Sequence, residues 1–185
     1  MRRVVFAVVL LAIGSLSLIV TASQQPPAPK VVDVEKLRDN LFVLIDLYYF
    51  GTGHTNGDAW VVFPALRVMD AGDDFGFKNL PRIDTLNHGS AMTFPDVLAT
   101  AVRTVNNVDT VIPGHSTQMM TMNDLRELAD FNREFLTLVR EAKKAGKSVD
   151  DVANTWKMPG LYTGFDAVQP DRLKTNVQLI FDEAK

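Results

Sequence analysis

Three strand-like apolar runs in this chain each end in a glycine that is followed directly by a side chain able to bind a metal ion. The three pairs are Gly53-His54, Gly72-Asp73 and Gly114-His115. Glycine lets the backbone turn sharply where a strand ends. Neighbouring strands of one sheet would bring the three turns within several ångströms of each other. The pattern therefore predicts that two imidazoles and one carboxylate converge on one ion.

Two histidines and one carboxylate form a ligand set with defined chemistry. The set suits Zn²⁺ that keeps a water in an open coordination position, and it equally suits Fe²⁺ held by a facial triad. The chain has no cysteine, which excludes thiolate ligands, thiol nucleophiles and disulfides. A histidine at a strand end is also commonly a hydrogen-bonded loop residue. The residues by themselves therefore leave two interpretations open, a metal site and an ordinary set of turns.

Further carboxylates lie close to the three pairs along the chain. Asp70, Asp73 and Asp74 fall within five residues, and their mutual repulsion favours a cation nearby. Asp58 follows an Asn-Gly pair, which predicts a turn role for it, with orientation of the His54 ring as the alternative.

Alternating strand and helix patterns are expected to position these side chains. Apolar runs predict two or three strands within residues 31–50. Further strands are predicted at residues 59–63, 66–69 and 110–113. Helices are predicted at residues 94–105, 122–142, 148–156 and 170–184. Thr93 is a candidate N-cap, and Thr121 with Asp124 is a candidate capping box. The fold class is therefore α/β, of the mixed α+β kind, and the chain ends in helices.

The N-terminal residues have the order of an export signal. Arg2 and Arg3 precede an apolar run over residues 4–20, and small residues around Ala22 are followed by a Pro-rich tract. We expect residues 1–22 to be a cleaved secretory signal and residues 23–30 a linker, which predicts a periplasmic or extracellular protein with no stable membrane anchor. Cleavage would remove two of the 19 basic residues and none of the 22 acidic ones, leaving a net charge of −5. A chain this acidic is not expected to bind nucleic acid.

Three motifs, in this order, resemble segments of the metallo-β-lactamase superfamily. The sequence Gly-His-Thr-Asn-Gly-Asp at 53–58 is similar to its H-T-x-G-D segment, and Asp-Ala-Gly-Asp at 70–73 lies where H-T-G-D or H-A-G-D usually occurs. The sequence Ile-Pro-Gly-His at 112–115 resembles its closing P-G-H. The resemblance implies an αββα sandwich in which zinc activates a water to hydrolyse lactams, thioesters, phosphodiesters or related bonds. It also implies that His54 binds the first metal ion, that Asp73 bridges or serves the second, and that His115 binds the second.

The chain also departs from the pattern of that family. The leading H-x-H-x-D-H motif, which supplies most ligands of the first metal, is absent, and about half of the first sheet is missing with it. The three remaining ligands can hold one ion at most, with zinc as the expected metal and iron as the alternative. Asp70 stands where the family has a histidine. Asp58 and Asp70 are expected to lie next to the ligands and to support them without binding the ion themselves. His88 has no strand leading into it, and we expect it to brace a loop.

These observations predict a truncated metallo-β-lactamase-like domain over residues 31–120 and a C-terminal helical extension over residues 121–185. The expected function is metal-dependent hydrolysis of a small-molecule substrate, which the missing motif puts in question. The alternative is a non-catalytic metal-binding or structural fragment whose helices serve as an interaction surface. The sheet is expected to lack much of its facing layer, and each large apolar side chain left in water forgoes roughly 1.5–3 kcal/mol. We therefore also expect self-association through the uncovered sheet face.

Overall fold

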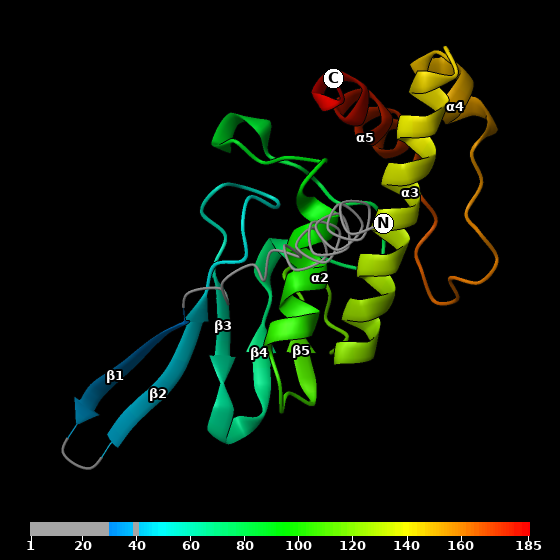
Figure 1. Ribbon diagram of the computed structural model, residues 1–185. Helices are drawn as coiled ribbons and strands as arrows, with labels where there is room; N and C mark the ends of the chain where they lie inside the picture. Colours follow the sequence, from blue (N-terminus) through cyan, green and yellow to red (C-terminus); the bar gives the residue numbers. More distant parts are fainter. Residues whose placement is uncertain (1–29, 39–40) are drawn as a thin grey trace, which may run out of the picture.

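A five-stranded sheet carries the fold in the computed structural model, which describes residues 30–38 and 41–185 (Figure 1). The strands are β1 (Lys30–Arg38), β2 (Leu41–Tyr48), β3 (Trp60–Phe63), β4 (Val68–Asp70) and β5 (Thr110–Ile112), and their order in the sheet follows their order in the chain. Neighbouring strands are antiparallel except β4 and β5, which are parallel. A parallel pair needs a crossover, and here helix α2 (Phe94–Thr104) lies within it.

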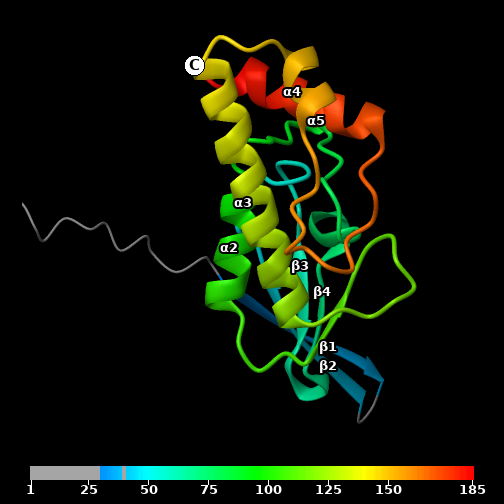
Figure 2. The same ribbon diagram turned by 90° about the vertical axis from the view of Figure 1, so that its right-hand side faces the viewer.

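Helices α2 and α3 (Met122–Lys144) cover one face of this sheet (Figures 1 and 2). Side chains alternate along the strands, so each strand sends every second residue toward the helices. The most deeply buried strand residues of the core are Trp60, Val62, Met69 and Val111, all at most 4% exposed. The residues between them on the strands stay partly exposed: Val61, Phe63, Val68 and Ile112. The described residues thus form one sheet with helices on one face, which is part of the four-layer sandwich expected from the sequence.

The last third of the chain packs against the far part of α3. It contains α4 (Val149–Thr155) and α5 (Pro170–Glu183). Their apolar residues join α3 in a second core cluster, in which Phe131 and Val177 are at most 1% exposed. The predicted capping box at Thr121 and Asp124 is present at the start of α3, and Ser148 with Asp151 forms another at the start of α4.

Some local expectations differ from the structure. The charged residues after 34 were expected to separate two strands, but β1 continues to Arg38, because its backbone stays paired with β2 along this stretch. Thr93 stands at the N-cap of α2, yet its hydroxyl donates to the Thr52 carbonyl instead of capping the helix.

The structure bears only in part on the expectations about export and membranes. The predicted signal segment and all of the linker up to residue 29 lie outside the described residues. Among the helices of the described part, none combines the length and the apolar character that a membrane crossing requires.

Candidate metal centre

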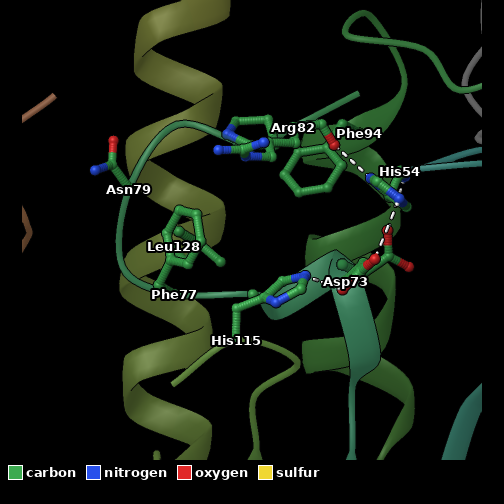
Figure 3. A pocket seen from close by; sticks show the side chains of 11 residues that line it. His54, Asp73, Phe77, Asn79, Arg82, Phe94, His115 and Leu128 are labelled. Carbon is green, nitrogen blue, oxygen red and sulfur yellow. Dashed lines mark hydrogen bonds and ion pairs between the residues drawn. The ribbon is translucent and has the colours of Figure 1, made fainter. Parts of the chain in front are cut away.

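The three predicted ligands lie together at the end of the sheet where β4 and β5 finish (Figure 3). Asp73 lies in the short 3₁₀ turn that follows β4, His115 follows β5, and His54 lies in the loop between β2 and β3. The carboxylate contacts both imidazoles. Its Oδ2 atom is 3.3 Å from His54 Nε2, and its Oδ1 atom is 2.9 Å from His115 Nε2. The structure therefore brings together the side chains singled out by their glycines, although their role as ligands stays a prediction.

All three of those glycines are required by the local geometry, since a Cβ atom on Gly53 would clash with the buried Asp74 carboxylate. Gly72 has a φ of +49°, in the left-handed region that side chains other than glycine's rarely adopt. Gly114 packs directly on the neighbouring turn, where its N–H donates to the Gly72 carbonyl at 3.0 Å. A Cβ atom on Gly114 would lie 2.7 Å from Asp73 Oδ1 and 2.7 Å from the Gly72 carbonyl oxygen. The turns that carry Asp73 and His115 can approach this closely only without a side chain at 114.

The ring of His54 is oriented by a main-chain carbonyl. Its Nδ1 atom is hydrogen-bonded to the carbonyl oxygen of Arg82. A carbonyl can only accept, so Nδ1 carries the hydrogen, and Nε2 of the neutral ring holds a lone pair. That lone pair faces Asp73 Oδ2, which is also an acceptor. Two facing acceptors repel each other, so this contact calls for a positive species: a proton on Nε2 or a metal cation.

Asp74 ties the turn that carries Asp73 to the loop that carries His54. Its side chain is 2% exposed, accepts the His54 backbone N–H at 2.9 Å, and accepts the Trp60 indole N–H at 2.8 Å. Burial, followed by the nearby charge of Asp58, raises the pKa of Asp74 to about 7. Asp74 therefore fixes the backbone of His54 from beneath the site.

The other candidate residues shape turns. Asp58 accepts the Thr55 N–H at 2.8 Å and the Thr55 hydroxyl at 2.5 Å, so it supports the turn after His54, while the ring itself is held by the Arg82 carbonyl. Asp70 Oδ1 accepts the Gly72 N–H at 2.9 Å and shapes the turn that leads to Asp73.

His88 lies apart from the three converging side chains. It is exposed, and it ends a short 3₁₀ turn at a φ of +61°. This matches the loop position expected for it.

The C-terminal helix α5 holds the loop that orients His54, and sequence reasoning missed this contact. Asn176 donates to the Pro81 carbonyl at 3.1 Å, and Arg172 donates to the Leu80 carbonyl at 3.1 Å. Farther along the same loop, Glu183 accepts the Ala91 N–H at 2.9 Å. Arg82 orients the imidazole through its main chain, which residue type does not reveal. The signal available in the sequence was the position of Asn176 within the apolar stripe of the predicted helix, and the structure leaves it 3% exposed.

A cavity of about 70 Å³ opens beside the three side chains. Figure 3 shows Phe77 and Leu128 on the side opposite His54. As the side chains stand, no group of three or more potential ligands in the described part of the chain has the arrangement of a formed metal site. The two imidazoles instead contact the carboxylate directly.

Comparison with solved structures identifies the fold. No family model and no curated protein match the sequence. The chain is similar to the stereoselective inverting sec-alkylsulfatase Pisa1 from Pseudomonas sp., with a TM-score of 0.61 and 15% identity over 84% of this chain and 26% of that one. A double mutant of the same sulfatase gives a TM-score of 0.60 and 14% identity over 85% of this chain and 25% of that one. The metallo-β-lactamase DIM-1 aligns over 55% of this chain and 46% of its own, with 18% identity and a TM-score of 0.42.

The extent of these matches defines what is shared. The chain spans about a quarter of the length of the sulfatase, and identities of this size establish a common fold alone. The matched segment includes most of the chain. The structure and the comparisons together show that this chain has part of the metallo-β-lactamase fold, in which one sheet with its helices is followed by a helical C-terminal segment.

Proposed function

We propose that His54, Asp73 and His115 bind one divalent metal ion, with zinc as the expected metal. The observation that carries the proposal is that both Nε2 atoms face the two oxygens of one carboxylate, at 2.9 and 3.3 Å. Donor atoms around a tetrahedral zinc with bonds of 2.0–2.2 Å are roughly 3.4 Å apart. A small separation of these side chains would therefore open a place for one ion.

The surroundings of His54 support its role as a metal ligand. Histidine ligands commonly donate their second ring nitrogen to a carbonyl or carboxylate, and the Arg82 carbonyl occupies that position. Two histidines and one carboxylate are the protein ligands of several catalytic zinc sites. The same donors suit Fe²⁺, which is therefore the alternative metal.

We further propose that the metal-loaded chain is a hydrolase that acts on a small molecule. Zinc at such a site supplies a Lewis acid and lowers the pKa of a bound water to near 7. The chain's own residues hold the ligands in place, and the aromatic rings of Phe77 and Phe94 shield the cavity beside them. The fold shared with a sulfatase supports hydrolysis, and the short length of the chain makes a non-catalytic metal-binding fragment the second candidate.

Metal binding is tested by calorimetric titration of the metal-free chain with zinc. We expect one ion per wild-type chain. The change His115→Ala should weaken binding by more than the roughly 10–100-fold loss that follows removal of an outer partner. His88→Ala is the matched control, because His88 is exposed in a loop and should leave the affinity unchanged. Equal zinc binding by the wild type and His115→Ala would refute the assigned site.

Hydrolysis is tested separately with the zinc-loaded chain. Ester, lactam, phosphodiester and secondary alkyl sulfate substrates cover the bonds in question. Turnover that His115→Ala abolishes and His88→Ala preserves would support the enzyme. If the loaded wild type binds zinc and is as inert as His115→Ala on all four substrates, the non-catalytic candidate replaces it.

Export remains a proposal that rests on the order of residues in the first 30 positions. We propose that the mature protein begins close to residue 23 and is found outside the cytoplasm. Mass spectrometry of the chain recovered from the periplasm of an expressing bacterium checks both points. An intact Met1 in the cytoplasmic fraction alone would contradict them.

A further inference from the structure

Arg172 on α5 is a cation held in a fixed position without an acidic partner. Its Nη1 atom donates to the Leu80 carbonyl at 3.1 Å, and its guanidinium lies 4.5 Å from the centre of the Phe77 ring. The residue is only partly exposed. Among the residues that the structure describes, Arg172 has no carboxylate within ion-pair distance. A carbonyl and an aromatic face fix its position but leave its charge unneutralised.

Other partly exposed cations of the described chain are compensated differently. Lys78 contacts Asp124 and Glu127 at 2.8 Å each, and Arg133 pairs with Asp96. Lys143 donates to two carbonyl oxygens close to the end of α5. Because a partly buried charge is costly without a counter-charge, Arg172 stands out from Lys78 and Arg133.

A second arginine lies close to Arg172 and adds to the positive charge. The pKa of Arg172 is lowered by burial and by the charge of Arg82, while Asp166 acts in the opposite direction. Arg82 is exposed and forms no ion pair with any residue in the described part of the chain. Arg82 and Arg172 line one groove, so an anion bound there would relieve the repulsion between their two positive charges.

The two arginines line a groove that adjoins the candidate metal centre. Arg82 and Arg172 share this groove, of about 440 Å³, with Gln169, Asp171 and Thr175. Arg82 also lines the smaller cavity beside His54, so the groove and the cavity have a wall in common. Phe77 connects them further, because its ring lies under Arg172 and 6.4 Å from the ring of His115.

We propose that Arg82 and Arg172 bind the oxyanion of a small organic anion whose apolar part lies against Phe77, beside the metal-binding side chains. Guanidinium groups bind planar and tetrahedral oxyanions through paired N–H donors. Asp171 lines the same groove, so a single negative charge fits better than a double one. The substrate class is therefore a monoanion such as a carboxylate or a sulfate monoester with a short apolar chain. This inference rests on the proposed function only in assuming that the substrate binds in the cavity beside His54, Asp73 and His115.

Titration of the full chain without metal tests this site independently of zinc. Hexanoate is the probe, hexan-1-ol is its uncharged counterpart, and inorganic sulfate tests the head group alone. Backbone ¹H–¹⁵N NMR follows binding residue by residue. Hexanoate should shift signals from residues 77–82 and 172–176 and bind at least tenfold more tightly than hexan-1-ol. Sulfate should shift the signals around Arg82 and Arg172 more weakly, because it lacks the apolar chain.

Two variants and a control separate the charge from the fold. Arg82→Gln is at an exposed position and should fold normally, and it should weaken hexanoate binding about tenfold, as should Arg172→Gln. Arg126→Gln, at an exposed position of α3, should change nothing. Equal binding of hexanoate and hexan-1-ol, or unchanged hexanoate affinity in Arg82→Gln, would overturn the proposal. Hexanoate binding without any zinc binding would overturn the metal site and leave this anion site standing.

Discussion

The side-chain amide of Asn176 donates a hydrogen bond of 3.1 Å to the Pro81 carbonyl, one residue before the carbonyl of Arg82 that holds the His54 ring. The same amide nitrogen also donates to the Arg172 carbonyl at 3.0 Å, so both of its hydrogens are used. Asn176 is 3% exposed. A buried side chain on the last helix therefore fixes the position of the loop whose carbonyl orients the imidazole.

Replacing this asparagine should disturb the site more than the fold. In Asn176→Leu the Pro81 carbonyl loses its partner, and the Arg82 carbonyl should shift away from His54. We expect the zinc dissociation constant to rise roughly tenfold, as for other outer partners of a ligand. Long-range ¹H–¹⁵N NMR of the His54 ring should show a loss of the single Nδ1–H tautomer. Gln178→Leu, at an exposed position of the same helix, is the control, and equal effects of both changes would argue against positioning by Asn176.

The close approach of the two ligand turns makes Gly114 a sensitive position. In Gly114→Ala the new Cβ would meet Asp73 Oδ1 and the Gly72 carbonyl, both at 2.7 Å, and neither turn can move without separating the ligands. Overpacking of this kind costs typically about 1–3 kcal/mol of stability. Urea unfolding should show that loss, and zinc binding should weaken as well. Gly57→Ala, where a Cβ would meet nothing within 4 Å, should behave like the wild type.

Because of Asp74, the free energy of unfolding of the metal-free chain should fall as the pH is raised from about 4 to about 7. Its pKa is about 7 in the folded chain, mainly because of burial, and near 3.9 when unfolded. Between these values the folded chain binds the proton and the unfolded chain does not, so raising the pH favours unfolding. Each pKa unit corresponds to about 1.4 kcal/mol, which makes the expected loss a few kcal/mol.

Urea unfolding across this pH range measures the effect. Asp74→Asn cannot titrate, so its stability should change less between pH 4 and pH 7 than that of the wild type. The variant will be less stable at pH 4, because one amide oxygen cannot replace both acceptors of Asp74. Parallel pH profiles for the two chains would show that Asp74 does not titrate in this interval.

The partly exposed sheet face should drive association of the chain with a second copy. Val61 lies in the middle of this face and is paired with Asp70 across β3 and β4. Val61→Lys places a charge on the face while offering Asp70 an ion pair, so the fold should persist. Sedimentation velocity should show a dimer or larger species for the wild type and a monomer for the variant. Leu66→Ser is the control, because Leu66 is 71% exposed in the turn beyond the strand. A wild type that sediments as a monomer at high concentration would contradict the expectation.

Sequence patterns were informative wherever the structure depends on neighbours in the chain. The capping box of Thr121 and Asp124 is local, and so is the turn that Asp58 makes with Thr55, and both were expected. The meeting of His54, Asp73 and His115 could be predicted because the glycine turns follow β2, β4 and β5, which run in the same direction and end at the same edge of one sheet. Contacts that join distant segments could not be found in this way.

The parts that were missed share a physical reason. Every residue has a main-chain carbonyl, so nothing in the sequence marks that of Arg82 as the partner of His54. Arg172 and Asn176 donate hydrogen bonds to residues 92 and 95 positions earlier in the chain. Hydrophobic periodicity reports only on contacts within one helix or strand and cannot reveal such pairs. The lack of an acidic partner for Arg172 likewise depends on tertiary packing, which composition cannot show.

The contacts between α5 and the loop that ends near Ala91 have a consequence for synthesis. A ribosome delivers that loop long before α5, because the hydrogen bonds between them span 91 to 95 residues. The imidazole of His54 therefore has no settled carbonyl anchor while the chain is growing. Its orientation should be among the last features to form during translation, and a nascent chain arrested before Pro170 should hold the strands in place while its histidine still samples both tautomers.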